Sequence, residues 1–319
     1  MKAQVLIGSA LMLAINGHVL ANNNTTQVTQ FGTANSALAT QVDAASVANS
    51  IVIEQDGDNN QSEGEQTNTT LASTISIEQT GSANMTLSAL QNGSESASIQ
   101  YTQVGTANEA ATAQISAIQS GVLISQSGDA NSAGYVQFNS TSDVVNVFQD
   151  GSMNLTGATQ TSTSFSSIAV NQNGTMHSGI GFQSTGTLKS LSIDQDGMLH
   201  TAGSAQNDGD NMIIDIDQFD LEQTANAIQL NVSDSSIQIE QFGLQNNSDV
   251  EQLAGSGHSI ITMQSGDLNM TMVSQSGTGN MAMVTQFGST NQQETSQGNS
   301  NASAIAFQSG TGNIGSITQ

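Results

Sequence analysis

Two glutamines recur along the chain at nearly constant spacing, and this repeat constrains the fold more than any other feature. The first glutamine stands at positions 30, 55, 79 and 103 and continues at a similar interval, and the second follows it after eleven residues, or after twelve at Gln91. The repeat occurs thirteen times between Gln30 and Gln319. A fixed period of this length is typical of solenoids, in which each repeat contacts only its neighbours.

The composition alone is that of many disordered chains, because Asn, Gln, Ser, Thr, Gly and Ala dominate the 319 residues. A disordered chain has no reason to keep glutamine in phase over thirteen repeats, so the pattern favours a folded chain. Lys and Arg total two against 26 Asp and Glu, and this balance argues against nucleic-acid binding. Cysteine is absent, so no disulfide can stabilise the fold.

Residues 1–21 differ from the rest and are typical of a secretory signal peptide. Lys2 gives a short basic start, residues 5–15 form an apolar run, and Val19-Leu20-Ala21 offers a small-residue cleavage site. The run is too short to span a bilayer, and no later stretch reaches 18 apolar residues. We therefore expect no transmembrane segment, and we expect residues 22–319 to form a single domain of thirteen repeats.

Apolar and polar residues alternate before the first glutamine of each repeat. The residues four and two positions before it are aliphatic, as in Ile51 and Ile53 or Ile237 and Ile239. This alternation predicts a strand with one buried face. Gly stands two positions after the first glutamine in twelve repeats, with Asp220 as the exception, and it permits the positive φ of a tight turn.

A second strand is predicted after this turn. Asn stands five positions after the first glutamine in ten repeats, and His177, His200 and Gln223 replace it in the others. Small residues follow on the same face and would lie opposite the large aliphatic ones, which suits a thin core. The extra residue between Asn84 and Gln91 predicts a β-bulge.

Each repeat is therefore predicted to form a strand, an arc and a second strand. Stacked repeats predict an all-β solenoid with two facing parallel sheets and cross-β spacing. A buried amide is costly unless it is hydrogen-bonded, and stacked amides bond to those above and below them. We expect continuous amide ladders at the fixed positions, and we predict no catalytic, cofactor-binding or metal-binding residues.

The predicted ladder and turn residues form four sets. The first glutamines are Gln30, Gln55, Gln79, Gln103, Gln126, Gln149, Gln172, Gln195, Gln218, Gln241, Gln264, Gln286 and Gln308. The second glutamines are Gln41, Gln66, Gln91, Gln114, Gln137, Gln160, Gln183, Gln206, Gln229, Gln252, Gln275, Gln297 and Gln319. The asparagines are Asn35, Asn60, Asn84, Asn108, Asn131, Asn154, Asn246, Asn269, Asn291 and Asn313. The turn glycines are Gly32, Gly57, Gly81, Gly105, Gly128, Gly151, Gly174, Gly197, Gly243, Gly266, Gly288 and Gly310.

These residues resemble the curlin repeat, the unit of bacterial curli fibres. The family pattern is approximately Ser-x5-Gln-x-Gly-x-x-Asn-x-Ala-x3-Gln. Residues 73–84 carry its first half, and residues 103–114 carry its second half. The leading serine is relaxed and is kept only at Ser73, Ser120, Ser166 and Ser235.

The resemblance implies a secreted functional amyloid, a fibre on the bacterial cell surface that builds the biofilm matrix and adheres to surfaces. It also implies self-association, a minor nucleating subunit and an outer-membrane secretion machinery. The nucleating subunit of this family tends to carry basic repeats, so the single lysine after the signal peptide, Lys189, favours the major, fibre-forming role. The better-known subunits have five repeats and a glycine-rich leader, whereas residues 22–26 alone precede the thirteen repeats here.

Three groups of residues leave alternatives open. Asp194, Asp217 and Glu240 recur at one outward position, as a solubilising face or as a gate that protonation or Ca²⁺ relieves. His177 and His200 either replace Asn as hydrogen-bonding groups or bind a metal, for which no further ligands are found. The last repeats present an ordinary scatter or a lateral contact surface with Met270, Met272, Met281, Met283, Phe287, Ile305 and Phe307.

A structural fibre is the leading functional hypothesis, with head-to-tail growth through the strand edges of the terminal repeats. The alternative is a monomeric secreted solenoid that acts as an adhesin or binds ice or another surface. An enzyme is not expected, because the sequence has no nucleophile-elbow or metal motif. An ice-binding solenoid needs an outward row of Thr, but these positions read Ser36, Gln61, Glu109, Ser132, Leu155, Ser178 and Thr201.

Overall fold

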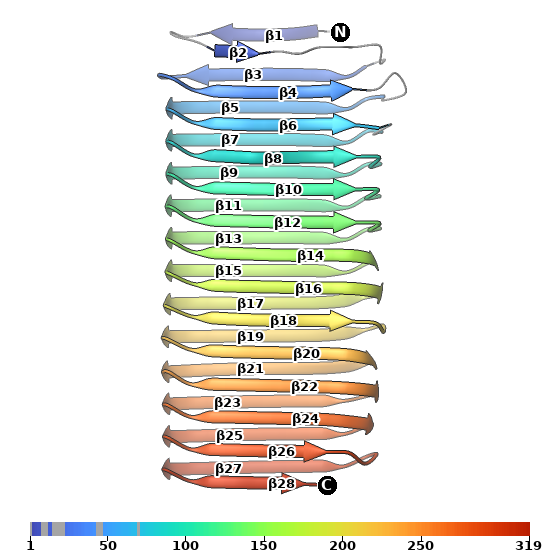
Figure 1. Cartoon of the computed structure of the whole chain (residues 1–319), viewed down its shortest axis with the longest axis vertical. Helices are drawn as coiled ribbons and strands as arrows, with labels where there is room; N and C mark the ends of the chain where they lie inside the picture. The colour runs from blue at the N-terminus through green and yellow to red at the C-terminus, as the bar shows by residue number, and fades with distance from the viewer. Residues whose placement is uncertain (1, 8–11, 15–22, 43–46, 69–70) are drawn as a thin grey trace. The chain divides into compact units, whose positions relative to one another are not determined.

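The computed structural model describes residues 2–7, 12–14, 23–42, 47–68 and 71–319. All regular elements in these residues are β-strands, and successive strands alternate between two parallel sheets (Figure 1). The chain divides into two compact units, Met1–Ser164 and Phe165–Gln319.

In the first unit, one sheet contains the odd-numbered strands and the other contains the even-numbered strands. The odd-numbered strands are β1 (Lys2–Ile7), β3 (Thr25–Phe31), β5 (Ser50–Asp58), β7 (Thr74–Ser82), β9 (Ser98–Thr106), β11 (Gly121–Asp129) and β13 (Val144–Ser152). The even-numbered strands are β2 (Met12–Ala14), β4 (Ser36–Val42), β6 (Gln61–Thr67), β8 (Met85–Asn92), β10 (Glu109–Ile115), β12 (Ser132–Phe138) and β14 (Leu155–Ser164).

The second unit has the same two-sheet arrangement. Its odd-numbered strands are β15 (Ser167–Thr175), β17 (Lys189–Met198), β19 (Met212–Leu221), β21 (Ser235–Leu244), β23 (Ser259–Asp267), β25 (Met281–Ser289) and β27 (Ser303–Thr311). Its even-numbered strands are β16 (Ser178–Thr187), β18 (Thr201–Asn207), β20 (Thr224–Ser233), β22 (Asn247–Ser256), β24 (Met270–Thr278), β26 (Gln292–Gln297) and β28 (Ile314–Thr318).

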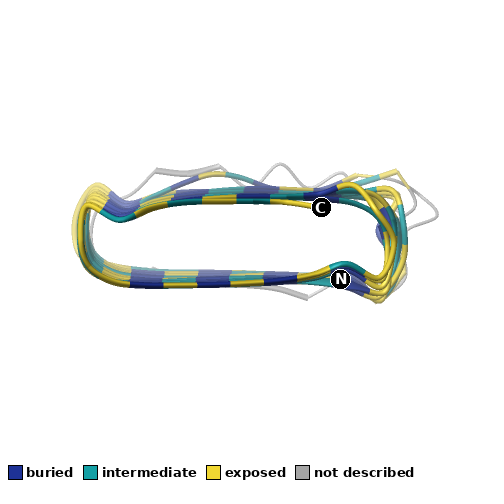
Figure 2. Ribbon diagram, turned by 90° about the horizontal axis from the view of Figure 1, so that it is seen from below, coloured by how far each residue is buried: buried dark blue, intermediate teal, exposed yellow. Residues whose placement is uncertain are grey.

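Within each unit, a strand pairs in parallel with the strand one repeat later, so equivalent residues lie side by side. In the pairing of β5 with β7, Gln55 lies opposite Gln79 and Gly57 lies opposite Gly81. Each repeat consists of two flat walls, one from each sheet, joined by two curved corners (Figure 2). Buried and exposed residues alternate along the walls, and the buried side chains fill the thin core between them. The predicted all-β solenoid of two facing parallel sheets is therefore confirmed.

The two walls can approach closely because large residues on one wall face small residues on the other. Ile51 and Ile75 are buried on the odd-numbered wall of the first unit, opposite Gly64. A Cβ on Gly64 would lie 3.1 Å from Ile51 Cγ2, so the small residue leaves room for the large one. In the second unit, Gly181 faces Ile168 in the same way, with 3.2 Å from an added Cβ to Ile168 Cγ2.

Among the described strand pairings, the register shifts at two places, in β8 and in β22. In β8 the pairing with β10 skips Leu87, which is exposed, and this confirms the predicted bulge between Asn84 and Gln91. A second shift, which the sequence did not predict, skips Ala254 in the pairing of β22 with β24. There the next repeat is one residue shorter, so Ala254 has no counterpart in it.

Strands β1 and β2 come from the stretch predicted to be a signal peptide. β1 pairs in parallel with β3, from Lys2 opposite Thr25 to Ile7 opposite Gln30, and β2 pairs with β4. The sequence set this stretch apart from the fold, but an open sheet edge accepts any extended segment with unpaired backbone groups. The predicted cleavage site at Val19-Leu20-Ala21 lies outside the described residues.

Candidate functional site

The first glutamines of successive repeats are joined by side-chain hydrogen bonds. In the first unit, each Nε2 from Gln30 to Gln126 donates to Oε1 of the next first glutamine, at 2.6 to 2.8 Å. In the second unit the same bonds run from Gln172 to Gln308 at 2.8 to 2.9 Å. All these amides point in one direction, from the earlier repeat to the later one.

The second glutamines form a similar series on the other wall. Their amides are linked from Gln41 to Gln160 at 2.8 to 2.9 Å. In the second unit they are linked from Gln183 to Gln319 at 2.8 to 3.3 Å. The remaining amide hydrogen is also used: Gln103 Nε2 donates to Met85 O at 3.3 Å, and Gln206 Nε2 donates to Ser190 O at 3.1 Å. Both donors of the buried amide therefore have acceptors, as burial requires.

The asparagines bond to one another and also to the backbone of the corner, and the sequence did not predict the backbone bonds. Asn108 Nδ2 donates to Asn84 Oδ1 at 3.1 Å, and the backbone N–H of Asn108 donates to the same oxygen at 3.1 Å. Asn84 Nδ2 donates to Thr80 O in its own turn at 3.2 Å and to Gly105 O in the next turn at 3.0 Å. Asn269 makes the same kinds of bond in the second unit. Where Asn is present, it thus links its own first corner to the next one.

The turn glycines have positive φ, and most of them have no space for a side chain, whereas at Gly310 no atom lies closer than 3.6 Å to an added Cβ. Gly105 has a φ of 118°, and a Cβ there would lie 2.1 Å from Gly128 O in the next repeat. The residue before each Asn is also left-handed and, except for Gly312, is not glycine, as in Ala107 (57°) and Leu268 (58°). This conformation costs about 1 kcal/mol per residue, and the backbone bond from Ala107 N–H to Ser82 O at 3.0 Å offsets it. No residue type in the sequence signals it.

Residues 259–288 match the family model of the curlin-associated repeat. The curlin resemblance is confirmed in this segment. It runs from β23 through β24 into β25 and includes Gln264, Gly266, Asn269, Gln275 and Gln286. No curated protein matches the chain. The curlin repeat and the solenoid fold together support a curlin-like structural protein.

The leading serine of the curlin pattern has a defined role at the second corner of the repeat, where the chain passes from the even-numbered to the odd-numbered wall. Ser73 Oγ accepts the backbone N–H of Ala97 at 3.2 Å, and Ser235 Oγ accepts that of His258 at 3.1 Å. Asn49 Oδ1 accepts the N–H of Ser73 at 2.9 Å. Ser and Asn are therefore equivalent acceptors here, and a search for either type six residues before the first glutamine would have found both.

Lys189 occupies this same position and is buried. Its Nζ donates to Ser184 O, Thr185 O and Gln206 O at 2.5, 2.9 and 3.3 Å. Burial lowers the pKa of Lys189 to about 8, while Asp208 and Asp210 oppose this shift. The sequence singled out Lys189 only as a charge, whereas the structure assigns it to the interior of the corner.

The first corner that follows Gln218 carries two substitutions and keeps part of the asparagine geometry. Asp220 replaces the turn glycine with a φ of 82°, and its Oδ2 accepts the N–H of Gly243 at 2.9 Å. Gln223 replaces Asn and donates to Gly243 O at 3.0 Å, but its Oε1 has no hydrogen-bond partner among the described residues. This repeat therefore departs furthest from the pattern.

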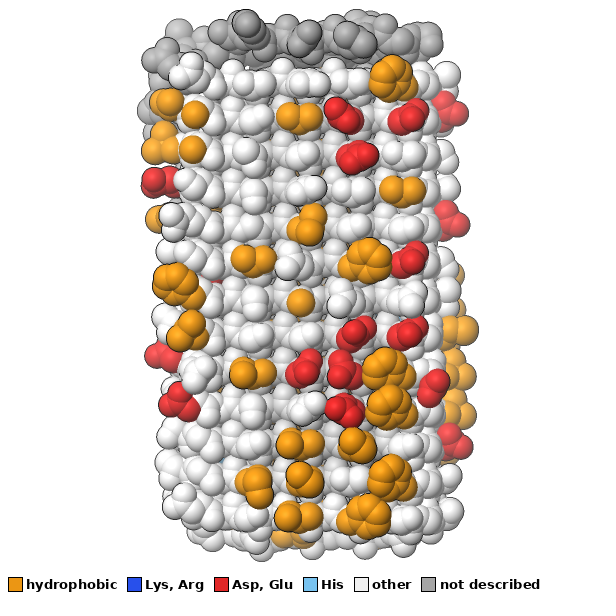
Figure 3. Space-filling view, turned by 180° about the vertical axis from the view of Figure 1, so that it is seen from behind, with side chains coloured by type: hydrophobic (Ala, Val, Ile, Leu, Met, Phe, Trp, Pro, Cys, Tyr) orange, Lys and Arg blue, Asp and Glu red, His pale blue; other side chains and the backbone are white. Residues whose placement is uncertain are grey.

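The outward carboxylates Asp194, Asp217 and Glu240 lie side by side on β17, β19 and β21. Burial and the carboxylates of Asp215, Asp194 and Glu240 raise the pKa of Asp217 to about 6. Burial and neighbouring carboxylates also raise the pKa of Asp194. Figure 3 shows a group of acidic side chains in the lower half of this face, with apolar side chains beside and below them.

The exposed apolar residues of the last repeats do not form one patch. Met281, Met283, Phe287, Ile305 and Phe307 lie on β25 and β27 of one wall. Met270 and Met272 lie on β24 of the other wall. The sequence grouped all seven residues, but alternate strands belong to opposite walls and separate them.

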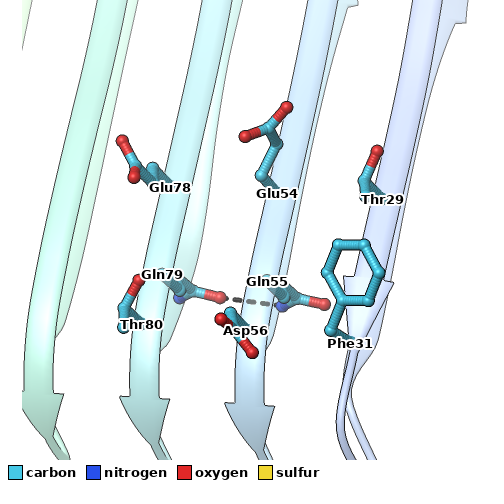
Figure 4. A pocket seen from close by; sticks show the side chains of 8 residues that line it. All are labelled: Thr29, Phe31, Glu54, Gln55, Asp56, Glu78, Gln79 and Thr80. Carbon is cyan, nitrogen blue, oxygen red and sulfur yellow. Dashed lines mark hydrogen bonds between the residues drawn. The ribbon is translucent and has the colours of Figure 1, made fainter. Parts of the chain in front are cut away.

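A shallow hollow on β3, β5 and β7 is lined by Thr29, Phe31, Glu54, Gln55, Asp56, Glu78, Gln79 and Thr80 (Figure 4). The side chains of Gln55 and Gln79 are buried on the core side of these strands, where they form the 2.7 Å bond of the first ladder. Within the described residues, no group of three or more His, Asp or Glu could hold a metal ion. In the same residues, no helix is long and apolar enough to cross a membrane.

Proposed function

We propose that this chain is the major structural subunit of an extracellular, curli-like amyloid fibre of a bacterial biofilm, which grows head to tail. The repeat and the fold support a structural, amyloid-type role, and the secreted location, the biofilm matrix and surface adhesion follow from the curlin resemblance. The expected partners are further copies of the chain, a minor nucleating subunit and an outer-membrane secretion machinery.

The observation that carries this proposal is the one-way order of the amide ladders. Gln308 Nε2 donates to Gln292 O, and its second amide hydrogen has no acceptor among the described residues. Gln319 Nε2 donates to Ser303 O, and its second amide hydrogen also has no acceptor among the described residues. At the other end of the series, Gln30 Oε1 accepts no hydrogen bond from the described residues. A second copy would supply the missing partners in the same register.

Residues 1–21 are proposed to be a signal peptide, and residues 22–319 a single repeat domain. Removal of the peptide would uncover the edges of β3 and β4, with which β1 and β2 pair. The processed chain would then present an unpaired edge to a second copy, which is the condition for edge-to-edge growth.

Purified chain spanning residues 22–319 tests the proposal by amyloid-dye binding and X-ray fibre diffraction. The expected result is fibrillation with a meridional reflection near about 4.8 Å, the spacing between neighbouring strands. A chain that keeps its β-sheet content but stays monomeric at all concentrations would instead support the non-polymerising solenoid adhesin.

Variants of the last repeat test the growth surface. Gln308→Leu with Gln319→Leu removes both unused donors, and we expect slower elongation of preformed seeds. Gln292→Leu is the matched control, because this exposed side chain lies on the outer face of β26. Equal elongation rates for the double variant and the control would contradict growth through the ladders.

A further inference from the structure

The two histidines that replace Asn at the first corner make hydrogen bonds that fix their protonation state. His177 Nε2 lies 3.1 Å from Asn173 O, and His200 Nε2 lies 3.1 Å from Asp196 O. A carbonyl oxygen only accepts, so Nε2 must carry the hydrogen in both rings. These contacts reproduce the bond that Asn84 Nδ2 makes to the carbonyl four residues earlier.

The other ring nitrogen faces a donor. The backbone N–H of His200 donates to His177 Nδ1 at 3.3 Å, and that of Gln223 donates to His200 Nδ1 at 3.3 Å. A nitrogen that accepts a hydrogen bond cannot carry a proton, so both rings must be neutral. A protonated ring would set two N–H groups against each other and leave a buried backbone donor without an acceptor.

The surroundings of the rings also disfavour charge. The two rings are stacked with centroids 4.9 Å apart and planes 5° apart, so two charged rings would repel each other. Burial lowers the pKa of His177 and lowers that of His200 to about 4. The charged groups near the rings are Asp196 for both and Asp220 for His200, and these carboxylates oppose the shift only partly.

We propose that the His177–His200 pair is an acid-sensitive joint, which holds the first corners of these two repeats closed at neutral pH and opens them when the rings are protonated. The ordinary Asn corner cannot respond in this way, because an amide does not titrate in this range. The turn glycine three residues before the histidine makes room for an imidazole in place of the Asn amide. A Cβ on Gly174 would lie only 2.9 Å from His177 Nε2. The proposal concerns the folded chain and does not depend on fibre formation.

Linkage gives the sign of the effect. The pKa of each histidine is lower in the closed corner than in an open one, where it is near 6.5, so the open form binds more protons. Closure is therefore favoured above about pH 6.5 and weakens as the pH falls toward about 4. For His200 alone, the open-to-closed ratio should rise on the order of 70-fold between pH 7.5 and 4.5.

Amide hydrogen exchange of the full chain under non-aggregating conditions tests the joint. After correction for the intrinsic exchange rate, opening at the N–H groups of His200 and Gln223 should rise by roughly that factor on acidification. The N–H groups of Asn269 and Asn291, which are held by Asn Oδ1, are internal controls and should not change. The variant His177→Asn with His200→Asn restores the residue found in ten repeats and should abolish the response.

A ¹⁵N-histidine titration of the unaltered chain keeps the proposal testable if the double variant fails to fold. We expect the Nε2–H tautomer at pH 7, with protonation of the two rings accompanying loss of amide protection. Two results would overturn the joint: rings that become charged while the amides of His200 and Gln223 stay protected, or a folded Asn variant with the same pH response as the parent.

Discussion

The two corners of the repeat solve the same problem in different ways. The first corner, most often Gln-x-Gly-x-x-Asn, keeps one length in all thirteen repeats and stacks glycine on glycine except at Asp220. The second corner, between the second glutamine and the next first glutamine, varies in length and is longer from Gln41 to Gln55 than from Gln297 to Gln308. Every change in repeat length but one, the bulge at Leu87, therefore falls in the second corner.

The second corner accommodates side chains of different size, because the volumes at two positions three residues apart compensate each other. Where the large residues Lys189, Met212 and His258 lie in the corner, glycine stands three residues before each of them. A Cβ on Gly186 would lie 2.9 Å from Lys189 Cε, and one on Gly255 would lie 2.8 Å from His258 Nε2. Where the second of these two positions holds a small residue, such as Ser120 or Ser235, the first position holds a residue larger than glycine. Ala117 and Val232 are the buried residues at the first position in these two corners. The comparison indicates that the first corner sets the register and the second corner absorbs variation.

The largest expected effect comes from placing the same residue in both corners. Gly105→Asn should destabilise the fold by about 3 kcal/mol or more, since a Cβ would lie 2.1 Å from Gly128 O. Gly93→Asn in the second corner should be nearly neutral, because the nearest atom to a Cβ there is 3.6 Å away and the equivalent Asn68 has the same left-handed conformation. Guanidinium unfolding midpoints compare the two, and equal losses would break the distinction between the corners.

The next effect compares the ladder with the second-corner acceptor. Gln103→Leu removes the acceptor of Gln79 and the donor to Gln126, and should cost about 2–4 kcal/mol. Ser120→Ala removes one acceptor, that of Asp143 N–H, and should cost about 1 kcal/mol. Gln100→Leu on the outer face is the control for the loss of an exposed amide. Chemical unfolding measures the loss of unfolding free energy in the three variants. A larger loss for Ser120→Ala than for Gln103→Leu would contradict the greater weight given to the ladder.

A smaller effect is expected for Lys189→Met, since Met212 occupies the equivalent position one repeat later. The loss should be about 1 kcal/mol from the bonds to the three carbonyls. The pKa of Lys189 is about 8 when folded and about 10.5 when unfolded, so the unfolded chain binds the proton more tightly. Thermal midpoints of the parent chain should rise between pH 8 and 10.5. If the thermal midpoint of Lys189→Met rises with pH in the same way, the titrating group is not Lys189.

The smallest effect concerns the outer wall rather than a corner. The pKa of Asp217 is raised to about 6 in the folded chain, so the folded state binds the proton more tightly than the unfolded one. Stability should fall as the pH rises from about 4 to 6. Asp217→Asn should raise the thermal midpoint at pH 7 by a small amount and reduce this pH dependence. Asp249→Asn, on the other wall, is a control that should change neither.

Much of the fold could be predicted from the sequence, because burial and strand geometry leave a direct trace in residue spacing. The alternation of Ile51, Ile53 and Gln55 marks one buried face, and glycine at position 57 marks the turn. The extra residue before Gln91 has only one physical outcome in a paired strand, a bulge. These features depend on period and volume, which a single sequence carries.

Other features depend on contacts between repeats and could not be predicted. The left-handed Ala107 is stabilised by a bond to Ser82 O in the preceding repeat, and no local residue type announces it. The asparagines were expected to bond to one another, but the same amides also donate to the backbone carbonyls of two turns, as Asn84 does. The interior position of Lys189 follows from glycine at 186, a pairing of volumes that is visible only once the corner is folded.

The central claim is that stacked glutamine amides set the register of the repeats, and that they continue it between copies. Solid-state NMR of fibres mixed from ¹⁵N-labelled and ¹³C-labelled chains measures contacts between copies alone. The account predicts a contact between the Gln308 amide nitrogen of one copy and the Gln30 side-chain carbonyl carbon of the next. Fibres in which the intermolecular contacts join other residues, with no glutamine-to-glutamine contact, would contradict it.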